Sequence, residues 1–438
     1  MRTRLSNESY IAQTAEKSAR VVVSGDDVKQ DLATTTTGKI YHLLDEAEVF
    51  SERNGGAISR WAANVLRDGP EIVVCPSFDD TWGFPENRLY RLANWSRTHS
   101  VHPILYRLPW TLQKSIYLAV FRPLLEKLRP GDLLYVHNKP VCAAVLATVS
   151  EKLDLRLVLH MHNSLLLRTT RAQRSAMKHL PLVFCSDFLL KEFQAFWPNH
   201  AAATCVVYNG ADGEKFRVAC ERSDAEPEII FTGRLVPYKG VHVLLQAMRI
   251  LENRGVKARC TIAGGAQFGT SRKTTYIRKL ERMKPANTQL VGYRAGEELA
   301  SLLRQADIFC CPSIWNDPFP LAPLEAMASG LPVVASRTGG IPEALAYGGG
   351  SMVPPADPNA LADALQSLIQ NASFREQKGQ EALQSFQKHF LWANVRQQYE
   401  SFIRNLHPDL NSRRAPAVNF SPTCQNLEAS DASRASCA

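Results

Sequence analysis

The 438-residue chain has no C-x-x-C pair, no apolar run long enough to span a membrane and no apolar stretch after its basic N-terminal residues. A membrane-spanning helix needs about 20 mostly apolar residues, and a secretory signal needs a hydrophobic region behind its charged start. The ten cysteines stand singly, apart from the adjacent pair Cys310 and Cys311. We therefore expect reduced, buried thiols in a protein that stays in the cytoplasm.

Charge is unevenly distributed along the chain. The net charge is +9, and residues 101–200 hold thirteen lysines and arginines against six acidic residues. Such a local excess is typical of a face that meets anionic lipid, phosphate or nucleic acid, or of a solvated surface without a partner. No nucleic-acid-binding motif accompanies the charge, so we predict no nucleic-acid partner.

Short β-branched runs alternate with longer helical patterns in both halves of the chain. This alternation predicts βαβ units, in which helices cover both faces of a parallel sheet. The runs lie at 40–44, 72–75, 103–106, 133–136, 157–159, 182–185, 205–208, 229–231, 260–263, 290–291, 308–310, 333–335 and 352–353. The predicted fold class is α/β, with two Rossmann-like domains facing across a cleft, and such sheets bind ligands at the carboxyl ends of their strands.

The length also favours two hydrophobic cores over one. Segments that lack sustained periodicity, and a polar interval near the middle, set the predicted domain boundaries. The prediction is an extension at 1–38, an N-terminal domain at 39–218, a linker at 219–228, a C-terminal domain at 229–388, a final helix at 389–405 and a tail at 406–438.

Two cations follow the strand predicted to end at Gly233. Arg234 offers a planar fork of donors and Lys239 a point charge, so both could converge on a pyrophosphate. The alternative is a pair of surface cations beside a turn.

A second motif runs from Pro312 to Val334, where a strand enters a loop and a short helix is predicted to open near Pro323. The free backbone N–H groups of Leu321 and Ala322 would face an anion, with the helix dipole behind them.

Asp317 and Glu325 lie eight residues apart in this motif. A carboxylate in the helix can accept from both ribose hydroxyls, and one in the loop can orient hydroxyls of a transferred sugar. The alternative, two unrelated surface charges, fits the surrounding strand, loop and helix less well.

In this order and spacing, the two motifs resemble the donor-binding domain of glycosyltransferase family 4, and the similarity covers roughly residues 39–405. The resemblance implies the GT-B fold, no metal or other cofactor, and transfer from a nucleotide-diphosphate (NDP) sugar with retention of configuration. The departing phosphate oxygen would take the acceptor's proton. Two positions depart from the pattern: Asp317 replaces the usual glutamate, and Pro320 stands where glycine is common.

The resemblance also implies further site residues. Gly55 and Gly56 would bring backbone N–H groups to phosphate, and Gly264 and Gly265 would lie near the nucleotide. His162 would sit beside the reacting sugar and act in catalysis with Asp317 and Glu325. The remaining counterparts are Phe319 in the donor loop, the turn at 208–212 with Phe216, and Trp392 in a helix that crosses back to the first domain.

Histidines end two predicted strands. We expect His160 and His162 to point to opposite faces, with His160 structural and His162 in the cleft, and no third ligand nearby for a metal. His137 could line the acceptor side.

The acceptor is predicted to be a saccharide or lipid-linked saccharide of the bacterial envelope, as in lipopolysaccharide or exopolysaccharide synthesis. Arg168, Arg171, Arg174 and Lys178 fall at helical spacing, and residues 110–129 form an aromatic, apolar and basic pattern. Together they could hold the protein at an anionic membrane. A nucleotide-sugar epimerase, a phosphorylase or a weakly catalytic nucleotide-sugar binder stays open.

Overall fold

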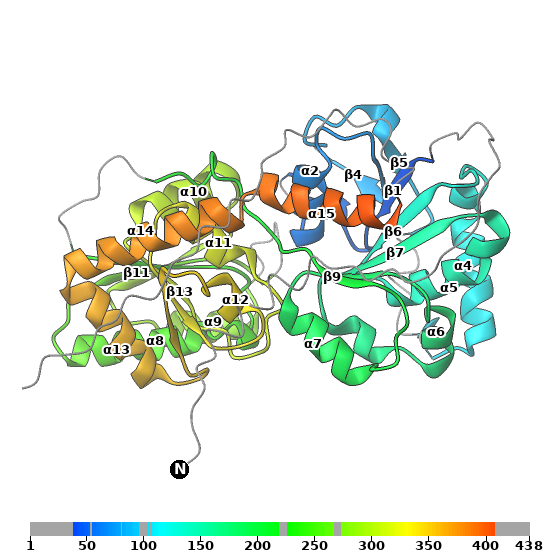
Figure 1. Ribbon diagram of the computed structural model, residues 1–438. Helices are drawn as coiled ribbons and strands as arrows, with labels where there is room; N and C mark the ends of the chain where they lie inside the picture. The colour runs from blue at the N-terminus through cyan, green and yellow to red at the C-terminus, as the bar shows by residue number, and fades with distance from the viewer. Residues whose placement is uncertain are drawn as a thin grey trace, which may run out of the picture.

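A computed structural model describes residues 38–52, 55–79, 81–95, 104–105, 107–218, 226–266 and 273–407. Almost all of the predicted extension and tail, and most of the predicted linker, lie outside these residues. Two separate parallel sheets, each with its own helices, stand side by side (Figure 1). The predicted α/β class with two Rossmann-like halves is confirmed, and the domain boundaries stay predictions.

The N-terminal half is built on a seven-stranded parallel sheet of order β5-β3-β1-β6-β7-β8-β9. Its strands are β1 (Ile40–Leu43), β3 (Ile72–Cys75), β5 (Leu89–Arg91), β6 (Leu133–His137), β7 (Arg156–Met161), β8 (Leu182–Phe184) and β9 (Thr204–Val206), and a separate pair is β2 (Val49–Phe50) and β4 (Ser77–Phe78). The chain builds outward from β1 in one direction and from β6 in the other. The two central strands therefore mark the switch point at which such sheets bind ligands.

Helices cover both faces of this sheet. They are α2 (Ala57–Val65), α4 (Trp110–Leu125), α5 (Pro140–Ser150), α6 (Arg171–Ala176) and α7 (Asp187–Phe196), with short 3-10 helices η1 (Glu86–Arg88), η2 (Glu151–Leu153) and η3 (Ser164–Arg168). Alternate strand residues divide between two cores, as the period of two requires. Tyr135 packs with α2, whereas Leu134 and Val136 pack with α4 and α5.

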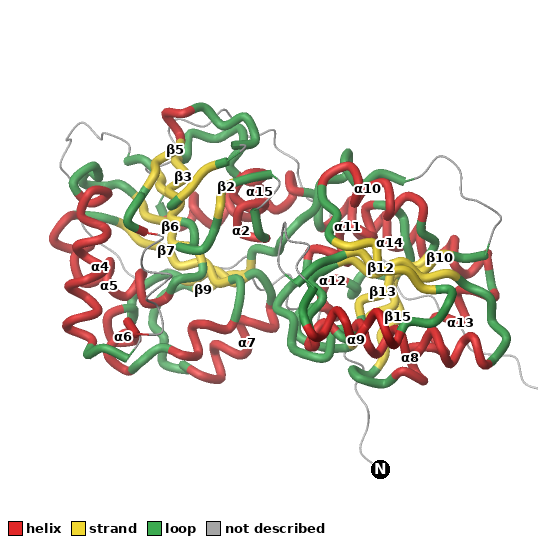
Figure 2. The backbone as a smooth tube through the Cα atoms, turned by 180° about the vertical axis from the view of Figure 1, so that it is seen from behind, coloured by secondary structure: helices red, strands yellow, loops and turns green. Residues whose placement is uncertain are grey.

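The C-terminal half holds a six-stranded parallel sheet of order β12-β11-β10-β13-β14-β15 (Figure 2). Its strands are β10 (Glu228–Thr232), β11 (Arg259–Ala263), β12 (Thr288–Gly292), β13 (Ile308–Cys311), β14 (Val333–Ser336) and β15 (Gly350–Val353). Its helices are η4 (Pro237–Lys239), α8 (Val241–Asn253), α9 (Thr275–Met283), α10 (Gly296–Gln305), α11 (Leu321–Ala328), α12 (Ile341–Ala344), α13 (Pro358–Gln370) and α14 (Ala372–His389). Here the switch point lies between β10 and β13.

The last described helix, α15 (Trp392–Leu406), belongs spatially to the N-terminal half, where Figure 1 shows it beside α2. Its buried residues Val395, Tyr399 and Ile403 share one apolar core with α2 and β1. The chain thus crosses between the halves a second time, at Phe390, whose carbonyl accepts from the Ala211 amide at 3.0 Å.

The described residues bear on two predictions, the lack of a membrane-spanning run and the reduced state of the cysteines. No helix in this part of the chain combines the length and apolar composition needed to cross a membrane. The seven described cysteines are all free thiols, and all but Cys205 are buried.

Candidate active site

The loops after β10 and β13 meet because these strands are neighbours at the switch point of the C-terminal sheet. Lys239, at the end of η4, forms an ion pair with Asp317 in the loop after β13. Gly240 follows at φ 73°, and a Cβ there would lie 1.8 Å from the Pro312 carbonyl oxygen. Only glycine allows the two loops to approach this closely. Two predicted site residues are therefore in direct contact.

Arg234 follows the same strand. Its guanidinium carbon lies 5.6 Å from the centre of the Tyr238 ring, a distance at which a cation is attracted to the aromatic face. None of the described acidic residues forms an ion pair with Arg234. The site therefore presents one cation bound to a carboxylate and one available for an anion.

Helix α11 opens beside Asp317. It begins at Leu321, two residues earlier than predicted, so Pro323 occupies its third position. First-turn amides have no acceptor within their helix, so those of Leu321 and Ala322 need a partner outside it. Their contact with an anion stays a prediction. The Phe319 ring is buried and stacks on Tyr208 with 4.9 Å between ring centres, so it holds the loop against the N-terminal half. Its contact with the donor stays a prediction.

Glu325, one turn into α11, pairs with a residue from the other half of the molecule. Arg60 of α2 donates from Nη1 to the Glu325 carboxylate at 2.8 Å. Burial raises the pKa of Glu325, and the neighbouring guanidinium of Arg60 opposes that shift. No role for Arg60 is predicted from the sequence, because nothing near it in the chain points to a partner 265 residues away.

The Arg60–Glu325 pair borders a cavity of about 360 Å³ between the halves. Of the predicted donor residues, this cavity collects Leu321 and Glu325. Its remaining walls come from both halves, and they are Glu52, Asn64, Arg67, Trp82, Gly210, Ala211, Asp212, Lys215, Phe216, Gly296, Leu299 and Trp392. Because the turn at 208–212 and Trp392 both line it, the cavity lies at the crossing between the halves.

Gly264 and Gly265, which follow β11, shape the loop after β10 that carries Arg234 and Lys239. A Cβ on Gly264 would lie 1.8 Å from the Gly233 carbonyl oxygen, and the Gly265 carbonyl accepts from the Leu235 amide at 2.7 Å. These glycines hold the segment that carries Arg234 against β11. Contact between them and a nucleotide stays a prediction.

The glycine-rich loop before α2 is arranged differently from the prediction. The Gly55 amide donates to the Ser51 carbonyl at 2.9 Å, and the Gly56 amide donates to Glu48 at 3.1 Å. The Glu48 carboxylate also accepts from the Ser59 hydroxyl at 2.7 Å. Both loop amides are therefore satisfied within the protein, and Glu48 occupies the position at which we expected phosphate.

A second contact across the halves was not predicted. Glu343 of α12 accepts from the amides of Asp187 and Phe188, at 2.7 and 2.6 Å, at the start of α7. Burial raises the pKa of Glu343 to about 7, although both backbone donors favour its charged form. Glu343 thus joins the C-terminal half to an N-terminal helix.

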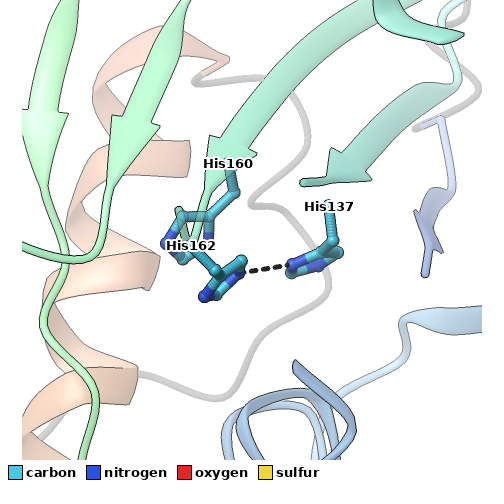
Figure 3. A group of neighbouring side chains, drawn as sticks. All are labelled: His137, His160 and His162. Atoms are coloured by element: carbon cyan, nitrogen blue, oxygen red, sulfur yellow. Dashed lines mark hydrogen bonds between the residues drawn. The ribbon is translucent and has the colours of Figure 1, made fainter. Parts of the chain in front are cut away.

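The prediction that His160 and His162 point to opposite faces is wrong. Side chains two positions apart along a strand share a face, and the two rings lie 4.1 Å apart, centre to centre. His137 joins them from β6, with its Nδ1 atom 3.2 Å from Nε2 of His162 (Figure 3). The expectation that no third ligand lies nearby is therefore also wrong.

The basic residues predicted on one helical face belong to separate segments. Arg168 ends η3, and Thr170 then caps α6, which contains only Arg171 and Arg174 of the set. Because the Thr170 capping box starts a new helix, no continuous stripe forms. Arg174 turns inward, with its guanidinium carbon 4.9 Å from the Phe196 ring centre, whereas Arg168, Arg171 and Lys178 stay exposed.

Comparison with known proteins supports the family resemblance. The family described as Glycosyl transferases group 1 matches residues 212–385. The D-inositol 3-phosphate glycosyltransferase of Corynebacterium urealyticum is 33% identical over 241 residues, which are 51% of this chain and 56% of that protein. The chain therefore spans little more than half the length of this relative.

Solved structures share the fold over a larger part of the chain. Sucrose-phosphate synthase from Thermosynechococcus elongatus superimposes with a TM-score of 0.66 at 19% identity, covering 84% of this chain and 99% of that one. Anabaena Alr3699/HepE, solved in complex with UDP-glucose, gives a TM-score of 0.63 at 19% identity, with the same coverage.

The two parallel-sheet halves and the superposition on these structures show the GT-B fold. Residues 212–385 are similar to the Glycosyl transferases group 1 family, which agrees with the resemblance that the motifs indicated.

Proposed function

We propose that this enzyme transfers a hexose-type sugar from an NDP-sugar to a saccharide or lipid-linked saccharide, with retention of configuration and without a catalytic metal. The proposal rests above all on one contact, the ion pair between Lys239 and Asp317 at the switch point of the C-terminal sheet. Asp317 of this pair lies on the loop that leads into the first-turn amides of α11, where a diphosphate would be held.

In the proposed reaction, Arg234, Lys239 and the Leu321 and Ala322 amides stabilise the charge that develops on the leaving diphosphate. The diphosphate draws Lys239 away from Asp317, and the freed carboxylate then orients hydroxyls of the transferred sugar. Glu325 accepts from the ribose. The two cations of the donor site neutralise the diphosphate charge, as a divalent metal does in other transferases.

We propose an acceptor of the bacterial envelope, used at the cytoplasmic face of the inner membrane. Helices α4 and α6 support this location, because the side-chain amide of Gln173 donates to that of Gln113 at 3.1 Å and holds the two helices together. Exposed Arg171 therefore lies on a helix next to α4, whose Leu112 is 46% exposed. Cations beside an exposed apolar residue are suited to an anionic lipid surface.

The decisive experiment incubates the full chain with a panel of NDP-sugars and candidate acceptors, with and without excess EDTA. We expect NDP release coupled to glycoside formation, an unchanged anomeric configuration by NMR, and equal rates in EDTA. An inverted anomer would refute retention, and activity abolished by EDTA and restored by Mg²⁺ or Mn²⁺ would refute the metal-free reaction.

The same assay separates the rival activities on this fold. A phosphorylase would need inorganic phosphate and release a sugar phosphate, and an epimerase would return an isomerised nucleotide sugar without an acceptor. Binding of NDP-sugar with no product in any arm would indicate a weakly catalytic binder.

A further inference from the structure

The histidine group at the carboxyl ends of β6 and β7 stands outside the donor-side chemistry. One nitrogen from each of His137, His160 and His162 can be chosen so that the three atoms lie within 4.8 Å of one another. Figure 3 shows the three imidazoles turned toward a common space, and the ring centres of His137 lie 5.5 and 5.4 Å from those of His160 and His162.

The nitrogens on the far side of this space already have partners. Nε2 of His137 is 3.1 Å from Nδ1 of His42, and Nε2 of His42 is 2.9 Å from the Tyr399 hydroxyl. Nδ1 of His160 is 3.2 Å from the Tyr135 hydroxyl. Outer partners of this kind fix the ring orientation and tautomer of metal-ligating histidines.

Two further nitrogens of the group lack a partner. Nε2 of His160 and Nδ1 of His162 are buried, and among the described residues neither has a hydrogen-bond partner. Burial lowers the pKa of all three imidazoles, and the neutral imidazole is the form that binds metals.

We infer that His137, His160 and His162 form a binding site for a Zn²⁺-like transition-metal ion in the N-terminal half. An all-nitrogen set favours Zn²⁺, Co²⁺ or Ni²⁺ over Mg²⁺ and Ca²⁺, which prefer oxygen. Tetrahedral Zn²⁺ with Zn–N bonds of about 2.0–2.1 Å places its ligand nitrogens about 3.4 Å apart. The observed 3.2 Å between Nδ1 of His137 and Nε2 of His162 is close to this value. His160 completes the set with a nitrogen that lies within 4.8 Å of the other two, and three protein ligands leave one coordination position open.

The metal site is separate from the proposed sugar transfer, but its effect on activity rests on that proposed function. His162 is the residue predicted to lie beside the reacting sugar, so an ion held by its ring would compete with that role. Zn²⁺ should therefore inhibit transfer, and EDTA should reverse the inhibition. This effect differs from a metal requirement, for which EDTA would do the opposite.

The test measures binding with neither donor nor acceptor present, so its result does not depend on sugar transfer. The full chain, stripped with a chelator, is dialysed against buffered Zn²⁺ and, separately, titrated with Co²⁺ under reducing conditions. We expect one ion per chain bound at this site and the visible absorption of tetrahedral Co²⁺. In His160→Gln the affinity should fall by more than about 100-fold, and in His42→Phe, which removes an outer partner, by about 10–100-fold.

The matched control is His200→Gln, which removes a half-buried histidine of the same half whose ring meets that of Trp197 edge to face. It should bind as the wild type does. X-ray absorption of the Zn²⁺-loaded wild type gives a readout that does not depend on any variant folding, and it should show an all-nitrogen or oxygen first shell with imidazole scattering. Three results would overturn the site. They are a sulfur shell at about 2.3 Å, no bound ion in the wild type, and equal affinity in a folded His160→Gln protein.

Discussion

Arg60 and Glu325 come from opposite halves of the molecule, and Nη1 of one lies 2.8 Å from Oε1 of the other. The Arg60 side chain is 25% exposed and the Glu325 side chain 6%. Glu325 is buried and depends on a cation from the facing half. The arrangement of the two halves is therefore coupled to the residue that we propose binds the ribose.

The first prediction concerns this pair. Arg60→Met leaves Glu325 buried without its cation and should destabilise the protein by about 1–3 kcal/mol, measured by denaturant unfolding. A double-mutant cycle with Glu325→Gln should give a coupling energy of about 0.5–3 kcal/mol. Arg67→Met, an exposed cation on the same cavity, should change stability by less than about 0.5 kcal/mol. Additive effects of the two substitutions would show that the pair carries no coupling.

The second prediction concerns the two cations after β10. Arg234→Ala and Lys239→Ala should each cost about 2–4 kcal/mol of transition-state stabilisation in kcat/KM, because each removes a group facing the leaving diphosphate. Lys257→Ala removes an exposed lysine of the same half and should leave kcat/KM unchanged. Near wild-type turnover in both site variants would place the diphosphate elsewhere.

The third prediction separates the two carboxylates. Asp317→Asn should lower turnover and spare NDP affinity, because we propose that this carboxylate acts on the sugar. Glu325→Ala should weaken binding of both NDP and NDP-sugar, because we propose that Glu325 accepts from the ribose. Asp317→Glu, which restores the longer side chain, should change the preferred donor sugar or lower activity. Calorimetric titration with NDP and a donor panel measure these effects, and equal loss of NDP affinity in Asp317→Asn and Glu325→Ala contradicts the assignment.

The fourth prediction concerns pH. Burial raises the pKa of Glu343 to about 7, so the folded protein holds a proton that the unfolded chain releases near its ordinary value of 4.5. The resulting stabilisation is full below that ordinary pKa and is lost as the pH rises through about 7, with an upper limit of about 3 kcal/mol. Unfolding measured from pH 4 to 8 should show this loss in the wild type. Glu343→Gln should lack it and differ otherwise by a constant offset.

The control for Glu343 is Glu376→Gln, which removes an exposed glutamate and should parallel the wild type at every pH. If Glu343→Gln also parallels the wild type, the carboxylate is ionised throughout the range and the two backbone donors outweigh its burial.

The fifth prediction concerns membranes. Replacing Arg168, Arg171 and Lys178 by glutamine should weaken binding to anionic vesicles about 100-fold, at about 1 kcal/mol for each cation, and salt should weaken wild-type binding. Lys257, Arg282 and Lys388 are exposed cations of the other half, and replacing them removes the same charge. That control should bind as the wild type does. Co-sedimentation insensitive to lipid charge and salt would exclude the proposed surface.

The sequence predicted those parts of the fold that depend on local patterns. Alternating apolar runs located most strands because burial on both faces leaves a near-continuous hydrophobic stretch. The exceptions were weak or misleading runs. β5 was missed, since Leu89–Arg91 is short and carries an arginine, and Ile104 and Leu105, predicted in a strand, are helical.

The site was predicted less completely, for a physical reason. Motifs located Lys239 and Asp317 because each follows a strand, and neighbouring strands in a parallel sheet bring such loops together. Partners from the other half, such as Arg60 for Glu325 and Asp187 for Glu343, leave no local signal. The histidine group was missed through an incorrect face assignment, although the spacing of two residues pointed to a shared face.

The return of α15 to the N-terminal half affects how the chain folds during synthesis. Val395, Tyr399 and Ile403 complete a core whose other members lie mostly before residue 210. A ribosome must therefore translate the whole C-terminal half before the first sheet can bury its second face. Until then, the surface around Trp61 and His42 is exposed to chaperones and proteases. The N-terminal half is thus synthesised first but completes its fold last. A chain truncated before Trp392 should leave the core of this half exposed and should aggregate.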